Sequence, residues 1–350
     1  MISSVPDPLQ DFRSPWWLPG GHLQTVWRKL VSAPQLHRSR RRIELQDGDF
    51  IDLDFAAAHS TRSVNDPTPL VFLLHGLAGC SASPYIVAMQ TLLQQNGYDS
   101  VAMNLRGCSG DFNRLAVAYH SGCSHDVEEV ISALLPELTA ARKLAVIGYS
   151  LGANVLIKWL SETPHRDRVL AAVSVSNPFE LALCCGRMNS GVAYLYGRYF
   201  LNRLRVDLKS KQTEFEKRGR DDQLAVIRGL GSLDSIKTLW GFDDAVTAPL
   251  HGFNGARDYY DKCSSRQFLP AVTVPSLLIH GRNDPIIPPQ AVPCQNELPS
   301  HIHCEVLKAG GHVGFAADGQ PHWLERRILN FIELTQINQS CSVGGKSALS

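Results

Sequence analysis

Short apolar runs without polar alternation recur along the chain, and they predict strands that are buried on both faces. They occupy residues 69–76, 98–107, 143–150, 169–177, 275–281 and 303–311. Helical stretches separate most of these runs, and such an order requires parallel crossover connections. An earlier segment, 41–55, alternates around Asp47-Gly48 and predicts a hairpin. The pattern therefore predicts an α/β fold with an open, mostly parallel sheet and helices on both of its faces.

Residues 178–255 interrupt this pattern, because they contain no convincing strand-like run. Apolar and aromatic side chains recur there at helical spacing: Val192, Leu195, Tyr196, Tyr199, Phe200 and Leu204. We interpret this segment as a helical cap inserted into an α/β core that comprises residues 41–177 and 256–336. Residues 1–40, whose Pro-, Trp- and Gly-rich start lacks clear periodicity, form an N-terminal arm. The small polar residues of 337–350 predict a flexible tail.

The bulk composition limits the classes of function. The 350 residues are 44% hydrophobic and 19% charged, which suits a protein with a sizeable core. A formal net charge of +1 gives no electrostatic argument for nucleic-acid binding. The nine cysteines lack the spacing of a zinc or redox pair, and no secretory signal or apolar segment of membrane length is visible. We therefore expect a cytoplasmic protein that binds no nucleic acid and has no integral membrane segment.

The most informative motif is Gly148-Tyr149-Ser150-Leu151-Gly152, which fits the pattern G-x-S-x-G between a predicted strand and a predicted helix. In a nucleophile elbow this tight turn lifts the serine hydroxyl above the carboxyl edge of the sheet. The helix that follows directs its N-terminus at the same place and favours developing negative charge. The motif therefore predicts that Ser150 is a nucleophile.

A serine hydroxyl needs a basic partner, usually a histidine that is held by a carboxylate. In this sheet architecture the acid and then the histidine follow the serine, each on a loop after a later strand. Asp284 and His312 follow the last two strand-like runs in that order, at the strand ends where open α/β sheets place their sites. We therefore predict that Ser150, Asp284 and His312 form a catalytic triad, with Asp243 and Asp244 as alternative acids.

Acyl chemistry also needs backbone N–H groups that stabilise an oxyanion. We expect these from Leu151 and from Leu77, which lies in the glycine-containing stretch HGLAG after the first buried strand-like run. His75 is expected to orient this loop, since a backbone donor needs rigid support. Together with Gly76 and Tyr149, His75 is also a candidate for contact with the substrate. No metal and no cofactor are expected.

We interpret the other polar clusters as structural and not catalytic. Three residues near the second buried strand-like run are expected to brace the loops around the site: Asn104, Arg106 and His120. His301, His303 and Cys304 resemble a ligand cluster, but on an alternating strand Cys304 points away from the two histidines. We therefore do not predict a metal site there.

Two adjacent tryptophans near the start of the chain, Trp16 and Trp17, allow two interpretations. We expect them to pack an N-terminal arm against the sheet edge, because an indole is first of all a large apolar surface. The alternative is that the residues after them, Gly20, Gly21 and His22, border the pocket.

Further motifs extend from residue 15 to about residue 330: PWWLPGGHLQTVW (15–27), HGLAG (75–79), NLRGCSG (104–110), YHSG (119–122), GYSLGANVLIKWL (148–160), FDDAVTAPLHGF (242–253) and IHGRNDPIIP (279–288). Together they resemble the YheT-like branch of the α/β-hydrolases, which is similar to plant embryogenesis-associated hydrolases, yeast medium-chain ester synthase/esterases and mammalian membrane-anchored phospholipase relatives. The resemblance implies a triad of Ser150, Asp284 and His312 and an ester-type substrate. The N-terminal membrane anchor of the eukaryotic relatives is not expected here, because only fourteen residues precede Pro15.

These observations predict a serine hydrolase that cleaves a small-molecule, lipid-like carboxylic ester with a short- to medium-chain acyl group. A serine at the elbow, where dehalogenase or epoxide chemistry would use an aspartate, favours acyl transfer. Two alternatives stay open. An acyltransferase that passes the acyl group to an alcohol would differ in how well the closed site excludes water. A non-catalytic binding protein could use the same fold, because a fold alone does not determine a function. The oligomeric state is not indicated by the sequence.

Overall fold

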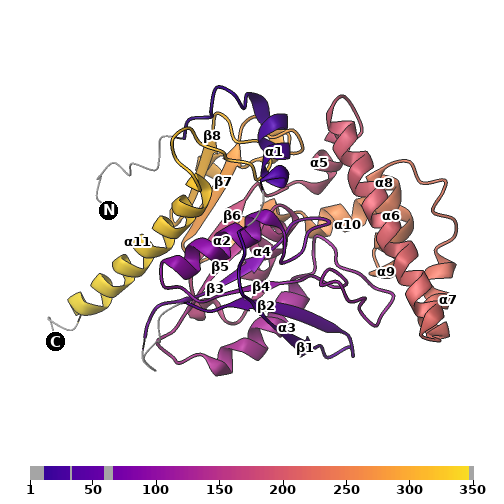
Figure 1. The fold of residues 1–350 in the computed structure, drawn as a ribbon, viewed down its shortest axis with the longest axis horizontal. Helices are drawn as coiled ribbons and strands as arrows, with labels where there is room; N and C mark the ends of the chain where they lie inside the picture. The colour runs from indigo at the N-terminus through magenta and orange to yellow at the C-terminus, as the bar shows by residue number, and fades with distance from the viewer. Residues whose placement is uncertain (1–11, 32–33, 59–65, 347–350) are drawn as a thin grey trace.

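One eight-stranded sheet organises the computed structural model, which describes residues 12–31, 34–58 and 66–346 (Figure 1). The strands are β1 (Ser39–Glu44), β2 (Phe50–Ala56), β3 (Leu70–Leu74), β4 (Ser100–Met103), β5 (Leu144–Tyr149), β6 (Val169–Val175), β7 (Ser276–Gly281) and β8 (Ile302–Leu307). Their order is β1-β2-β4-β3-β5-β6-β7-β8, and only the β1–β2 and β2–β4 pairs are antiparallel. The predicted α/β class with a mostly parallel sheet is confirmed, as is the hairpin, which is β1–β2.

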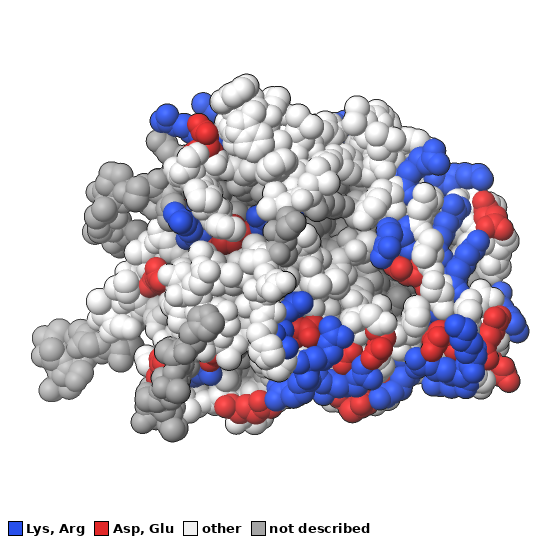
Figure 2. All heavy atoms as spheres, in the orientation of Figure 1, with Lys and Arg blue, Asp and Glu red and all other residues white. Residues whose placement is uncertain are grey.

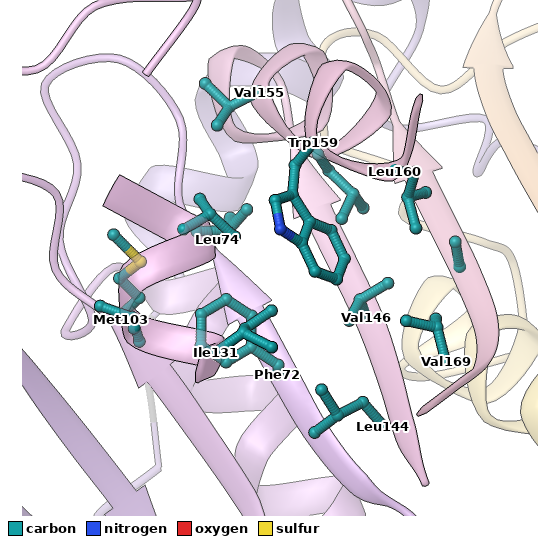
Figure 3. Packing of buried hydrophobic residues seen from close by; sticks show 14 of the residues in the cluster. Phe72, Leu74, Met103, Ile131, Leu144, Val146, Val155, Trp159, Leu160 and Val169 are labelled. Atoms are coloured by element: carbon teal, nitrogen blue, oxygen red, sulfur yellow. The ribbon is translucent and has the colours of Figure 1, made fainter. Parts of the chain in front are cut away.

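The central strands are buried on both faces, which explains their uninterrupted apolar sequences. Phe72 and Leu74 of β3 belong to one hydrophobic cluster, whereas Val71 and Leu73 belong to a second cluster. The first cluster includes residues of two helices, α3 (Ser124–Leu134) and α4 (Leu151–Glu162). Trp159 of α4 lies over the sheet in Figure 3. The second includes residues of α2 (Pro84–Gln95) and α11 (Trp323–Lys346).

The segment interpreted as a cap contains helices and no strand over residues 178–255, all of which the structure describes. The helices are α5 (Leu181–Arg187), α6 (Ala193–Lys217), α7 (Asp221–Gly229), α8 (Leu239–Phe242), the π-helical turn Asp243–Thr247 and α9 (Ala248–Leu250). They are followed by α10 (Gly255–Cys263) and a 3₁₀ helix, Ser265–Ala271. Phe200, Phe215 and Tyr259 contribute to a third hydrophobic cluster within this part of the molecule. In Figure 1 helices α6 to α9 lie together at one end of the molecule.

Both ends of the described chain differ from the expectation. The N-terminal arm contains a helix, α1 (Gly20–Leu30), where the sequence shows no clear periodicity. At the other end α11 continues to Lys346, so a flexible tail does not begin at residue 337. This correction has a local cause, because the side chain of Gln339 accepts a hydrogen bond from Lys143 and donates one to the Leu170 carbonyl. Within the described residues no helix is both long enough and apolar enough to cross a membrane.

Candidate active site

Ser150 lies in a strained turn between β5 and α4. Its φ of 53° and ψ of −121° are a backbone conformation that side chains rarely adopt. The two flanking glycines are required by space, since a Cβ at Gly148 would lie 2.6 Å from the Gly152 carbonyl oxygen. A Cβ at Gly152 would overlap the carbonyl oxygen of His75. The G-x-S-x-G spacing thus allows β3, β5 and α4 to approach closely enough to form the turn.

Three side chains that are distant in sequence form one hydrogen-bonded chain. His312 Nε2 lies 2.8 Å from Ser150 Oγ, and His312 Nδ1 lies 2.8 Å from Asp284 Oδ2. Ser150 follows β5, Asp284 follows β7 and His312 follows β8, all of which run parallel in the sheet. The structure therefore brings together the three residues that the strand-end argument selected.

The hydrogen bonds of Asp284 define the proton positions in this chain. Its Oδ1 atom accepts the N–H groups of Ile286 and Ile287 at 2.8 and 3.0 Å. Burial raises the pKa of Asp284, but the charge and hydrogen bond of His312 and the backbone N–H of Ile286 outweigh it, and the pKa lies below its usual value. An ionised carboxylate accepts the His312 Nδ1–H, so Nε2 is left as the acceptor of the Ser150 hydroxyl proton.

The two alternative acids lie elsewhere. Asp243 accepts hydrogen bonds from the Tyr260 hydroxyl at 2.5 Å and the Thr247 hydroxyl at 2.7 Å, and Asp244 accepts the N–H of Ala256 at 2.9 Å. Among the described residues neither carboxylate contacts the His312 ring, whereas Asp284 does. Asp243 instead faces the cavity beside Ser150.

Asp243 should make the stability of the protein depend on pH. Burial raises the pKa of Asp243 from 3.8 to about 6, although its two hydroxyl partners oppose the shift. The stabilisation linked to its proton is complete below pH 3.8 and is lost as the pH rises through 6. We expect this loss to be about 2 kcal/mol, since solvent in the cavity screens part of the shift. Asp243→Asn should abolish it, as measured by urea unfolding at several pH values. Parallel stability curves for the two proteins would contradict the assignment.

The predicted oxyanion donors lie beside the Ser150 hydroxyl. Leu77 and Leu151 line the same cavity as Ser150 and His312. Within the described residues neither the Leu77 nor the Leu151 amide N–H donates to a protein acceptor. The amides beside Leu77 are occupied, because the Gly76 N–H donates to the Tyr85 hydroxyl and the Ala78 N–H donates to the Tyr119 hydroxyl, each at 2.9 Å. Two free N–H groups therefore remain next to Ser150.

The residues expected to contact the substrate require a correction. His75 and Tyr149 are fully buried, and neither lines the cavity. His75 Nε2 accepts the Leu105 N–H at 3.1 Å while Nδ1 lies 2.8 Å from the Gly76 carbonyl, and burial lowers the pKa of His75 to about 4. Tyr149 points into the cluster beneath α2, because alternate residues of β5 face opposite sides of the sheet. Gly76 lies behind Ser150, where a Cβ would be 3.0 Å from the serine Cβ. Of the two roles predicted for His75, its hydrogen bonds therefore fit support of the HGLAG loop and not contact with the substrate.

The residues predicted to brace loops make numerous hydrogen bonds. The Asn104 side chain accepts the Ser81 N–H at 2.9 Å and donates to Asp54. Arg106 forms a bidentate ion pair with Asp126, with both distances at 2.8 Å. Three further facts concern His120. It borders the cavity, its ring centroid lies 4.3 Å from that of His251, and burial lowers its pKa to about 3. His120 is therefore an uncharged part of the cavity wall at neutral pH.

Helix α1 holds the loop that carries His312, a role that the sequence analysis missed. Thr25 Oγ1 accepts the His312 N–H at 2.8 Å, and the Gln24 amide exchanges two hydrogen bonds with the backbone of Ala316. A Cβ at Gly21 would overlap the carbonyl oxygen of Asn283, so α1 also lies directly against the loop of the acid. The signal that could have found this contact is the stretch GGHLQT itself, with its adjacent glycines and polar pair.

The paired tryptophans do not pack the arm against the sheet as expected. Trp16 is 86% exposed and Trp17 is 48% exposed. Trp17 contacts the ring of Trp27 instead, with the centroids 5.1 Å apart. The reason is that α1 turns its polar side, which carries Gln24 and Thr25, toward the loops of the site, so its apolar side faces outward.

The cavity beside Ser150 is mainly apolar. Its walls come from the loop after β3, from α5 and α6, and from the loop after β7, and they include Leu77, Leu181, Met188, Phe200, Leu204 and Ile286. Among the described residues no group of three or more His, Cys, Asp or Glu side chains could hold a metal ion.

Comparison with known proteins agrees with this fold. The model of the family described as the alpha/beta hydrolase fold matches residues 69–318. The chain belongs to the α/β-hydrolase fold family. YheT of Escherichia coli (strain K12) is 35% identical over 91% of this chain and 92% of its own, which confirms the resemblance inferred from the motifs. A monoacylglycerol lipase of Saccharomyces cerevisiae is 27% identical over 77% of this chain and 60% of its own.

The fold of this α/β-hydrolase also matches solved structures. An esterase from Exiguobacterium antarcticum superposes with a TM-score of 0.55 at 17% identity, covering 84% of this chain and all of the other. Its likeness bears on the fold alone. The sequence relatives place this chain among the esterases and lipases of the family.

Proposed function

We propose that this protein is a serine hydrolase that cleaves carboxylic esters through an acyl-enzyme. The observation that carries the proposal is the pair of 2.8 Å hydrogen bonds joining Ser150, His312 and Asp284. The strained backbone of Ser150 adds support, because strain of this kind is retained mainly at functional sites.

Each group then has a defined role in the reaction. Ser150 Oγ attacks the acyl carbon while its proton passes to His312 Nε2, and Asp284 stabilises the imidazolium. The N–H groups of Leu77 and Leu151 stabilise the oxyanion, each by about 3–4 kcal/mol. The alcohol leaves with the proton from His312. Water then attacks the acyl carbon while His312 takes its proton. The bond to Ser150 Oγ breaks, the carboxylic acid leaves, and Ser150 recovers its proton from His312.

The apolar walls of the cavity favour an acyl chain over a charged group. The side chains that contact such a chain include Leu181, Met188 and Phe200. A short- to medium-chain acyl ester with a lipid-like alcohol fits this environment, and the name of the yeast relative, a monoacylglycerol lipase, agrees with a lipid ester. His312 lies at the same cavity, so the ester carbonyl can reach Ser150 while the chain lies in the apolar part.

A covalent probe and a substrate series test the proposal together. A fluorophosphonate should add to one residue, identified as Ser150 by peptide mass, and labelling should abolish the turnover of p-nitrophenyl esters. Across the series from acetate to palmitate, kcat/KM should be highest for short or medium chains. Product analysis with ethanol present separates hydrolysis from acyl transfer. Labelling at another residue, with turnover retained, would refute the assignment.

The contact between α1 and the acid loop should matter for the rate. Gly21→Ala places a Cβ where the Asn283 carbonyl oxygen lies, so α1 must shift and Thr25 must move relative to the His312 N–H. We expect kcat to fall by about 10- to 100-fold, since small misplacements of catalytic groups have effects of this size. Ester turnover and the rate of fluorophosphonate labelling measure the change.

The matched control for this substitution is Gly229→Ala at the end of α7, where a Cβ meets open space. It should leave kcat unchanged. Equal activity of the Gly21→Ala variant and the wild type would show that α1 does not position His312.

A further inference from the structure

An unusually large set of apolar side chains is exposed on the arm, α1 and the start of α6. Its members, which we call the α1–α6 face, are Trp16, Trp17, Leu23, Val26, Trp27, Leu30, Val192, Tyr194, Leu195 and Tyr199. Leu30 is 70% exposed and Leu195 is 65% exposed. Single exposed apolar residues are common on soluble proteins, but a contiguous group of this kind marks an interaction surface.

The two parts of this face adjoin each other. The ring of His22 on α1 stacks on the ring of Tyr196 on α6, with the planes 7° apart, and His22 Nδ1 lies 3.1 Å from the Tyr196 hydroxyl. Figure 2 shows largely uncharged atoms over α1 and the adjoining end of α6, with Lys and Arg atoms farther along α6. The apolar side chains therefore form one surface across two helices that are distant in sequence.

Positive charge borders this face. Arg187 and Arg282 line an open cleft together with His22, and Arg198 lies one turn after Leu195 on α6. In the part of the chain that the structure describes, none of these three arginines has a carboxylate within 4.0 Å. Exposed tryptophan and leucine with a border of unpaired arginine is the composition that suits the interface of an anionic bilayer.

We propose that the α1–α6 face docks this protein onto an anionic lipid bilayer. The tryptophan and leucine side chains enter the interface between headgroups and acyl chains, and the arginines contact the lipid phosphates. A second copy of the chain fits the face less well, because self-association through it would bring the positively charged borders together.

Docking through the α1–α6 face would bring the protein to a lipid substrate. The cleft that contains His22 and Arg282 is also lined by Asp284, so the face adjoins the predicted active site. A lipid ester in the bilayer would therefore meet the protein close to the loop that carries Asp284. This consequence rests on the proposed function, whereas the docking itself does not.

Vesicle sedimentation of the Ser150→Ala protein tests docking without catalysis. The probe is a vesicle of equal parts phosphatidylglycerol and phosphatidylcholine. A variant with Trp16→Ser, Leu30→Ser and Leu195→Ser should have at least about tenfold lower affinity for the vesicles. Three apolar side chains would then no longer move from water into the bilayer. Arg187→Gln with Arg282→Gln should weaken binding to these vesicles by about tenfold and leave any binding to pure phosphatidylcholine unchanged.

Matched substitutions on other helices are the control. Val226, Leu334 and Ile337 are also exposed, on α7 and α11, and their joint replacement by serine should leave vesicle binding unchanged. Circular dichroism reports that each variant is folded, with or without Ser150. In proteins that retain Ser150, turnover of soluble p-nitrophenyl acetate tests the proposed function separately. Vesicle binding without any turnover would refute the proposed function and leave docking intact.

Three results would overturn the docking proposal. The first is absence of binding to the anionic vesicles by a folded Ser150→Ala protein. The second is equal loss of binding in the α1–α6 face variant and in the control variant. The third is a dimer in analytical ultracentrifugation that the α1–α6 face variant abolishes, because the face would then be a contact between copies of the chain.

Discussion

Replacing Ser150 with alanine should lower kcat/KM for a p-nitrophenyl ester by at least about 10⁴-fold, the range seen when a serine nucleophile is removed from a triad. In the proposed mechanism the Ser150 hydroxyl oxygen bonds to the acyl carbon, and within the described residues no other hydroxyl lies within hydrogen-bonding distance of the His312 ring. Steady-state turnover measures the effect, and the variant should also fail to react with a fluorophosphonate. Its fold should be intact, since alanine leaves the backbone of the turn unchanged.

Two further variants test the same assignment. Ser161→Ala removes a hydroxyl at the other end of α4, where Ser161 donates only to the Lys158 carbonyl, and it should leave turnover unchanged. A double variant that lacks both His312 and Ser150 should lose little more kcat/KM than Ser150→Ala alone. The effects of residues that act as a unit do not add. Turnover within tenfold of the wild type in Ser150→Ala would exclude the acyl-enzyme.

Asp284→Asn should lower kcat by about 10⁴-fold without unfolding the protein. The two backbone N–H groups of Ile286 and Ile287 require an acceptor at Oδ1, so the new amide nitrogen must face His312 Nδ1. A donor at that position turns Nδ1 into an acceptor and puts the proton on Nε2. Nε2 can then no longer accept the proton of Ser150. Circular dichroism and turnover together measure this outcome.

Asp244, one of the two alternative acids in the sequence, provides the control for this variant. Asp244→Asn changes the carboxylate that accepts the Ala256 N–H, away from the His312 ring, and turnover should stay within about twofold of the wild type. If instead Asp244→Asn abolished turnover and Asp284→Asn did not, the acid would have been assigned to the wrong loop.

The sheet and the convergence of Ser150, Asp284 and His312 could be predicted because local patterns determine them. Strands buried on both faces appear as uninterrupted apolar runs, and parallel connections place every following loop at the same edge. This is why Asp284 and His312 could be selected from their position after β7 and β8 alone. The glycines on both sides of Ser150 added a steric requirement that few other turns have.

Other parts depend on contacts between distant segments, which no local pattern contains. His75 and Tyr149 stand next to residues of the site in sequence, but the pleat turns their side chains away from the cavity. The start of the chain departs furthest from its local pattern. An apolar stripe usually indicates the buried side of a helix, whereas in α1 the buried side is the polar one, which carries Gln24 and Thr25.

The hydrogen bonds between α1 and the loop of His312 join segments that are far apart in the sequence, since Thr25 and His312 are 287 positions apart. During synthesis α1 must wait until the sheet strands and the loop after β8 have left the ribosome before it meets Ala316. Closure of so long a loop is slow relative to local helix formation. The chain should therefore become enzymatically competent only in the final step of folding, after its sheet is complete.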